Sequence, residues 1–178
     1  MTQHDIITTR FDLGPMPGER AMRTLDEQLV QAPLERIFAL AADVERWPAL
    51  LPHYRHVRFQ ERRGDGGGIV DMSAYRPFGI VHWPTWWRSR MSVRSPGEPS
   101  GPSIRFTHIG GITTGMEVEW TFQPAGSATH VRILHLWDGP PVPGVGPLAA
   151  SLVIGPVFVH GIASRTLAGL ATAAERAP

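Results

Sequence analysis

The sequence lacks both cysteine and lysine, and each absence removes a class of chemistry. All 17 basic residues are arginines, and no cysteine is present. Without lysine there is no Schiff-base nucleophile, no lysine general base and no phosphate-binding lysine of a P-loop. Without cysteine there are no disulfides, no thiol catalysis and no thiolate ligands for a metal ion. Any reaction has to use the remaining polar side chains.

The chain also lacks a strong charge of one sign and a membrane-spanning run. Its net charge is +1, so we expect no nucleic-acid partner. The first residues carry no basic stretch followed by an apolar one, which predicts a cytoplasmic protein. Residues 145–163 are apolar except for Ser151 and His160, but glycine and proline interrupt them. A buried helix is predicted there, and residues 148–159 could make a transient membrane contact.

The 178 residues are expected to form one domain with an N-terminal arm. Gly14-Pro15 and Pro17-Gly18 predict a loose arm over residues 1–20, and residues 21–178 form the domain. Residues 21–30 are read as a first strand. Pro33 suits the first turn of a helix, and Leu34, Ile37, Phe38 and Ala41 follow at helical spacing. A second short helix begins at Trp47 and ends before Pro52.

After these two helices the apolar pattern changes to the period of two that is typical of strands. Six strands are predicted, at residues 56–62, 68–76, 80–94, 103–109, 115–123 and 128–138. A long helix over residues 157–176 ends the chain. Short turns between successive strands favour an antiparallel meander, so the fold class is α+β. The long helix is the one element able to cover the inner face of this seven-stranded sheet.

Three segments resemble the START-related (SRPBCC) superfamily. The phrase APLERIFALAADVERWPALLPHY resembles its pair of short helices, GMEVEWTFQPAGSATHVRI resembles two strands of polyketide aromatase/cyclases, and FVHGIASRTLAGL resembles their last helix. The likeness covers about residues 22–175. It implies the helix-grip fold, a curved seven-stranded sheet around a long C-terminal helix, with a cavity between them. It specifies the fold more closely than the activity, because members of this superfamily bind or convert many apolar molecules.

Strand alternation predicts which side chains face this cavity. The wall is mostly apolar and aromatic, which suits a hydrophobic ligand with a few polar anchors. A packed core without a cavity fits the same pattern, and the resemblance favours the cavity. The residues predicted to bind the ligand are Met72, Arg76, Trp83, Trp87, Phe106, Met116, Trp120, Ile133, Phe158 and Ile162.

Two histidines interrupt the apolar wall. His108 and His135 lie on strands that flank the sixth strand, so their backbones are about 10 Å apart. They are candidates for general acid and base, since imidazole titrates near neutral pH. The alternative is a pair of core histidines that are satisfied by hydrogen bonds. No third ligand lies at a suitable spacing, so we expect no metal and no cofactor.

Three further polar residues are candidates for contact with a ligand oxygen. Tyr54 matches a pocket tyrosine of some cyclases, although its hydroxyl could equally point to water. Arg76 ends its strand and could either hold an anion at the cavity mouth or extend into solvent. The cyclases place an arginine inside the fourth strand after a tryptophan-rich stretch. Alternation turns Arg90 outward here, and it becomes a catalytic candidate if a bulge at Pro84 shifts the register.

Three functions fit these observations. The first is a polyketide cyclase/dehydratase-like enzyme that closes a poly-ketone chain by aldol addition and dehydration. The second is a non-catalytic carrier of a quinone, a lipid or a polyketide product. The third is an interaction module like the ribosome-associating members of the superfamily, which the near-neutral charge disfavours. The partner expected is a hydrophobic small molecule; a homodimer is compatible with the sequence, which does not specify the oligomeric state.

Overall fold

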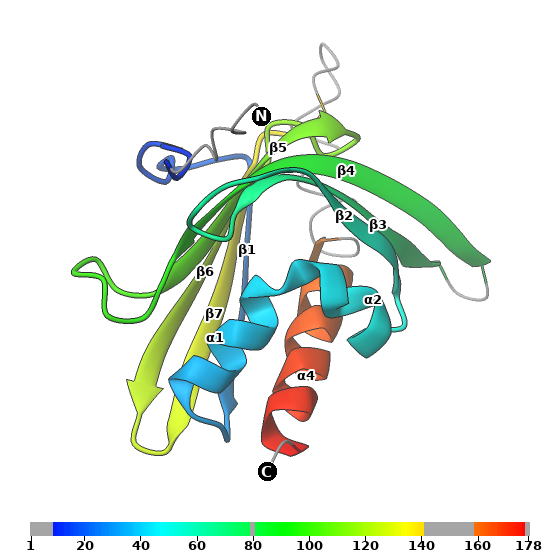
Figure 1. Ribbon diagram of the computed structural model, residues 1–178. Helices are drawn as coiled ribbons and strands as arrows, with labels where there is room; N and C mark the ends of the chain where they lie inside the picture. Colours follow the sequence, from blue (N-terminus) through cyan, green and yellow to red (C-terminus); the bar gives the residue numbers. More distant parts are fainter. Residues whose placement is uncertain (1–8, 79–80, 141–158, 177–178) are drawn as a thin grey trace, which may run out of the picture.

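The computed structural model describes residues 9–78, 81–140 and 159–176, without the side chains of residues 76–78 and 81–83. A curved antiparallel sheet arches over the helices, which lie against its concave face (Figure 1). The two short helical segments follow the first strand and the long helix ends the chain, as predicted for the helix-grip fold. No helix of the described part is long and apolar enough to cross a membrane.

The sheet contains seven strands in the order β1-β7-β6-β5-β4-β3-β2. Every neighbouring pair is antiparallel. The first strand closes the sheet against the last one, and the other strands follow one another as a meander. The strands are β1 (Met22–Val30), β2 (Tyr54–Arg62), β3 (Gly68–Phe78), β4 (Val81–Arg94), β5 (Ser103–Gly111), β6 (Glu117–Ala125) and β7 (Ala128–Trp137).

Two short helical segments cover one end of the concave face. Helix α1 (Leu34–Ala42) begins after Pro33 and buries Ile37, Phe38 and Ala41. The 3-10 turn η1 (Val44–Arg46) leads into α2 (Trp47–Leu50), which has Pro48 in its first turn. Proline is tolerated there because the first turn of a helix has no partner for its N–H. Leu51 leaves the helix again in an extended conformation, so the chain can enter β2.

Helix α4 (His160–Arg176) lies along the concave face of the sheet. In the sequence, one stripe at helical spacing contains Phe158, Ile162, Thr166, Gly169 and Ala173, which predicts that this stripe faces the sheet. The fully buried stripe is rotated by about one residue and consists of Ala163, Thr166, Leu167, Leu170, Ala171 and Ala174. Gly169 instead lies under Leu51, where an added Cβ would come within 2.3 Å of Leu51 Cδ2. The small residue lets the helix approach the end of α2 closely.

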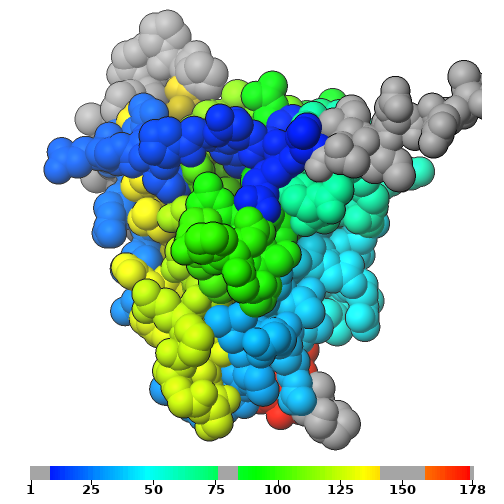
Figure 2. Space-filling view, turned by 60° about the vertical axis from the view of Figure 1, so that its left-hand side comes forward, coloured from blue at the N-terminus to red at the C-terminus, as the bar shows by residue number. Residues whose placement is uncertain are grey.

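The described part of the N-terminal segment packs on the outer, convex face of the sheet, whereas the sequence predicts a loose arm. Arg10 forms two hydrogen bonds with the carboxylate of Glu98, at 2.7 and 2.8 Å. The guanidinium of Arg63 lies 3.5 Å from the ring centre of Phe11, a cation–π contact. Figure 2 shows the segment in blue across the surface, beside the green residues that join β4 and β5. The boundary between arm and domain at residue 20 stays a prediction.

Candidate functional site

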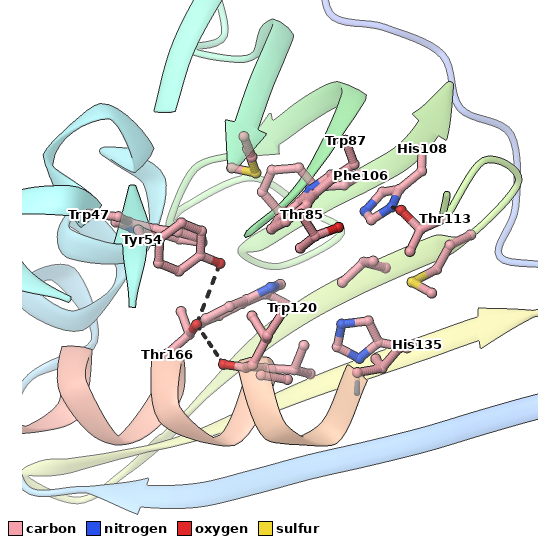
Figure 3. A pocket seen from close by; sticks show the side chains of 17 residues that line it. Trp47, Tyr54, Thr85, Trp87, Phe106, His108, Thr113, Trp120, His135 and Thr166 are labelled. Carbon is pink, nitrogen blue, oxygen red and sulfur yellow. Dashed lines mark hydrogen bonds between the residues drawn. The ribbon is translucent and has the colours of Figure 1, made fainter. Parts of the chain in front are cut away.

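A pocket lies between the concave face of the sheet and α4 (Figure 3). Its free volume is about 80 Å³. Most lining residues are apolar, and none of those in the described part is Asp, Glu or Arg. The lining residues are Trp47, Tyr54, Met72, Thr85, Trp87, Phe106, His108, Thr113, Met116, Val118, Trp120, Ile133, His135, Val159, Ile162, Ala163 and Thr166.

This volume is well below the roughly 300–1,000 Å³ of pockets that enclose a drug-sized ligand. A ligand with an aromatic ring therefore enters only if lining side chains move. Met72 and Met116 are suited to this, since methionine side chains adapt to irregular spaces. Both are buried in the pocket wall. These two methionines are therefore the wall residues best suited to make room for a ligand.

His108 is held at one end of the pocket by the turn between β5 and β6. The backbone N–H of His108 donates to the carbonyl of Met116, and the carbonyl of His108 accepts from the N–H of Gly115. These two hydrogen bonds close the turn. This brings the hydroxyl of Thr113 to 2.7 Å from His108 Nδ1. Because Nδ1 is occupied, Nε2 is the ring nitrogen left for a bound molecule. The ring also stacks on Trp87, with 6.0 Å between the ring centres.

His135 comes from β7, and the strand order confirms that β6 lies between it and His108. Its Nδ1 is buried and has no hydrogen-bond partner in the described part of the chain. Burial lowers the pKa of His135 from 6.5 to about 3. Burial, together with the unfavourable interaction with His135, lowers the pKa of His108 to about 3 as well. Both imidazoles are therefore neutral at physiological pH.

The opposite end of the pocket holds a hydroxyl pair. Tyr54 begins β2, and its hydroxyl lies 3.4 Å from Thr166 Oγ1 on α4. Thr166 also bonds to the carbonyl of Ile162 at 2.8 Å and to His53 Nε2 at 3.0 Å. Burial raises the pKa of Tyr54, which keeps the phenol protonated. Since the bond to Thr166 is long, the Tyr54 hydroxyl can turn toward a ligand oxygen at little cost.

A bulge explains why Tyr54 faces inward although the residues after it do not. The pairing of β2 with β3 shifts between Tyr54 and His56, so Arg55 is an extra residue. Arg55 and His56 are both exposed, whereas Tyr54 and Val57 are both buried. The bulge therefore aims the first residue of the strand into the pocket, as bulges near functional sites often do.

The structure brings together most of the residues predicted for the site. They come from β2, β3, β4, β5, β6, β7, α4 and the β5–β6 turn. Those that line the pocket are Tyr54, Met72, Trp87, Phe106, His108, Met116, Trp120, Ile133, His135 and Ile162. The side chains of Arg76 and Trp83, and all of Phe158, lie outside the described residues. Their predicted roles stay predictions.

Arg90 does not reach the pocket, which corrects its prediction as a catalytic candidate. The ladder between β3 and β4 runs without a shift past Pro84, so the register expected to turn Arg90 inward is absent. The irregularity lies instead between β4 and β5 at Arg88 and Ser89. Arg90 is exposed on the outer face, where its guanidinium lies 5.9 Å from the ring of Phe11.

Sequence reasoning missed several lining residues, among them Thr113 and Thr166. Thr113 belongs to a turn, Gly-Ile-Thr-Thr-Gly, and neither strand nor helix periodicity applies to it. Thr166 does carry a signal in the sequence, since it lies on the helix one turn after Ile162. Among the described residues, no group of three or more acidic, histidine or cysteine side chains could hold a metal ion.

A curved antiparallel sheet that grips a helix around an internal pocket defines the class of START-like proteins. The fold agrees with a START superfamily protein from Mycobacterium smegmatis, which is 18% identical with a TM-score of 0.65 over 87% of this chain and 98% of that chain. It also agrees with the Zhui aromatase/cyclase from Streptomyces sp. R1128, which is 19% identical with a TM-score of 0.68 over 86% of this chain and 93% of that chain.

Comparison with known sequences shows which family the chain belongs to. Residues 30–158 match the family described as polyketide cyclase/dehydrase and lipid transport, and the chain belongs to that family. A curated relative, the granaticin polyketide synthase bifunctional cyclase/dehydratase of Streptomyces violaceoruber, is 33% identical over 121 residues. This match covers 67% of the chain but only 35% of the relative, so the chain spans about a third of that protein.

Proposed function

We propose that this chain binds a poly-ketone chain in the pocket and promotes its cyclisation. The observation that carries the proposal is the polar end of the pocket. There, two neutral histidines and the Thr113 hydroxyl lie among apolar residues, while the Tyr54 and Thr166 hydroxyls lie at the opposite end. Carbonyl oxygens separated by short hydrocarbon units are the ligand chemistry that fits such a wall.

The reaction would proceed by proton transfer between the ligand and these neutral groups. A histidine removes a proton from the carbon between two carbonyls, and the resulting enolate carbon attacks a third carbonyl to form a carbon–carbon bond. A proton returns to the new alkoxide, and loss of water then gives a double bond. The Tyr54 hydroxyl is placed to donate to an enolate or alkoxide oxygen.

The low pKa values constrain this mechanism. An imidazole with a pKa of about 3 is a weak base in the empty pocket. A developing enolate next to the ring favours the protonated form, because an opposite charge within about 4–6 Å raises the pKa of a histidine. The histidines would therefore act as bases only when the substrate is bound, and would otherwise stay neutral.

Exchange of the methylene protons of 1-phenyl-1,3-butanedione for deuterium tests the proposal, since it reports proton removal without ring closure. Binding is measured in parallel by calorimetry. We expect binding and protein-dependent exchange in the wild type, and a loss of about 10²-fold or more in the exchange rate for His135→Gln or His108→Gln. The matched control is His130→Gln, which changes a partly exposed histidine on the outer face of β7.

A non-catalytic carrier is the second candidate, favoured by the largely apolar lining. It predicts binding of the diketone with no exchange above the rate in buffer. Wild-type exchange that equals the His130→Gln rate and survives both pocket substitutions would contradict the catalytic roles. Failure to bind any carbonyl-bearing aromatic probe would contradict both functions.

A further inference from the structure

One buried hydroxyl, that of Thr166, takes part in three hydrogen bonds at the Tyr54 end of the pocket. Thr166 is 1% exposed. Its Oγ1 lies 2.8 Å from the carbonyl oxygen of Ile162 and 3.0 Å from Nε2 of His53. It also lies 3.4 Å from the hydroxyl of Tyr54, a bond drawn as a dashed line in Figure 3. Since a hydroxyl has one proton to donate and two lone pairs that accept, these three partners use its full capacity.

The direction of each bond follows from this count of protons. A carbonyl oxygen only accepts, so the single Thr166 proton goes to Ile162, at the shortest of the three distances. Such a bond from threonine to the carbonyl four residues earlier is common in helices. The other two groups then donate to Thr166. His53 therefore carries a proton on Nε2, because a lone pair there would face a lone pair of Thr166 at 3.0 Å.

Backbone and ring contacts hold His53 in this position. Its carbonyl accepts a 2.8 Å bond from the N–H of Tyr75 on β3, and its ring centre lies 4.9 Å from that of Tyr54. Burial, together with the positive charge of Arg165, lowers the pKa of His53 to about 4. At neutral pH the ring thus has one proton, and its place on Nε2 or Nδ1 decides how Thr166 can bond.

A ligand oxygen beside Tyr54 changes the arrangement by rotation of two hydroxyl protons. The Tyr54 proton turns to the ligand, and the Thr166 proton turns from Ile162 to the Tyr54 oxygen. In helix α4 the carbonyl of Ile162 also accepts from the backbone N–H four residues later, so it is not left unpaired. His53 still donates to Thr166. The result is a row of donors in one direction, from His53 through Thr166 and Tyr54 to the ligand.

We propose that His53 and Thr166 are positioning residues that turn the Tyr54 hydroxyl toward a ligand carbonyl or enolate oxygen and strengthen it as a donor. The inference rests on the proposed function for the nature of the ligand. A hydroxyl whose oxygen accepts a hydrogen bond is a better donor, because successive hydrogen bonds polarise one another in the protein interior. With its proton on Nδ1, His53 would instead take the Thr166 proton, and Tyr54 would keep donating to Thr166.

The tautomer of His53 tests the first bond of the row without any ligand. ¹⁵N NMR of histidine-labelled protein distinguishes a proton on Nε2 from one on Nδ1, and His53→Gln assigns the signal. We expect the Nε2–H form in the wild type at neutral pH. An Nδ1–H form would overturn the proposal, whatever molecule the pocket binds.

The infrared carbonyl stretch of bound acetophenone, labelled with ¹³C at the carbonyl, tests the last bond, since a donor to this oxygen lowers the frequency. We expect the lowest frequency in the wild type and the highest in Tyr54→Phe. His53→Leu and Thr166→Val, which remove a donor, should move the frequency toward the Tyr54→Phe value. His53→Gln and Thr166→Ser, which keep a donor, should stay near the wild type. His56→Leu, at an exposed histidine on β2, is the matched control.

A carbonyl frequency that stays at the wild-type value in both His53→Leu and Thr166→Val would overturn the proposal. The bond between the two residues would then serve only to fasten α4 to the start of β2.

Exchange of the diketone methylene protons tests whether the row acts through Tyr54. We expect His53→Leu to slow exchange about tenfold in the wild type but not further in Tyr54→Phe, which lacks the last donor. Losses that add in the double variant would contradict the proposal. If the wild type binds acetophenone but exchanges no diketone protons, the proposed catalysis fails, and the infrared comparison still decides the inference. If exchange occurs and His53→Leu leaves it unchanged, the inference fails and the proposed function stands.

Discussion

The outer face of the sheet and the pocket on its inner face carry different kinds of polar side chain. On the outer face they occur as ion pairs, such as Arg88 with Asp71 at 2.6 Å and Arg63 with Glu61 at 2.9 Å. On the inner face the pocket polar groups are histidines, threonines and one tyrosine, and burial holds them neutral. The same strands carry both sets, since alternate residues point to opposite sides. The described lining of the pocket thus contains no Asp, Glu or Arg, and the pocket stays available for an uncharged ligand.

Trp86 and Trp87, which are neighbours on β4, show this contrast between the two faces most clearly. Trp87 is 8% exposed in the pocket wall, whereas Trp86 is 55% exposed on the outer face. We expect Trp87→Ala to lower the free energy of unfolding by about 3–5 kcal/mol, because it removes a buried ring that stacks on His108. Trp86→Ala should change it by less than about 1 kcal/mol. Urea denaturation of both variants measures the difference, and equal losses would contradict the assignment of the two faces.

The second test uses the pH dependence of stability. His108 and His135 have folded-state pKa values of about 3, below the ordinary value of 6.5. Between these values the unfolded chain binds protons that the folded chain does not, so the free energy of unfolding falls as pH falls through this window. From pH 7 to pH 5 each histidine should account for a loss of about 2 kcal/mol.

Denaturation of His108→Gln and His135→Gln at both pH values checks this, since each variant should lose about 2 kcal/mol less than the wild type on acidification. His130→Gln, on the outer face, should lose as much as the wild type. A steep loss that persists in both pocket variants would show that other groups cause it. In that case the folded-state pKa values of the two histidines would lie near the ordinary value of 6.5, and burial on the inner face would not hold them neutral below that pH.

The smallest effect concerns an exception, a buried arginine on the outer face. Arg105 is 8% exposed because the N-terminal segment covers it, and its guanidinium bonds to the carbonyl of Gly14 and to Glu117. We expect Arg105→Met to cost about 1–2 kcal/mol and to release this segment. Hydrogen exchange of residues 9–20 should rise in this variant, but not in Arg88→Met, whose side chain is exposed. Unchanged protection would contradict a clamping role for Arg105.

The fold could be predicted from the sequence because its signals are local. Proline and apolar spacing indicate the two short helices, and period-two alternation places the inner face, including Trp87 and His108. The alternation pattern fails where a strand contains a bulge, because a bulge changes which residues face inward. The extra residue at Arg55 turns Tyr54 inward, and the bulge expected at Pro84 is absent, so Arg90 remains outside. The pairing of β1 with β7 joins distant segments of the chain, and no local pattern indicates it.

The distribution of the six tryptophans gives the protein an intrinsic optical signal. Trp47, Trp87 and Trp120 line the pocket, Trp86 faces solvent, and Trp137 is fixed by a 2.9 Å bond from its indole N–H to the carbonyl of Thr114. A molecule that enters the pocket displaces water and side chains around the first three rings and leaves the last two unchanged. Its arrival is therefore expected to alter near-ultraviolet absorption and emission without any label, and Trp86→Phe removes the contribution of the exposed Trp86.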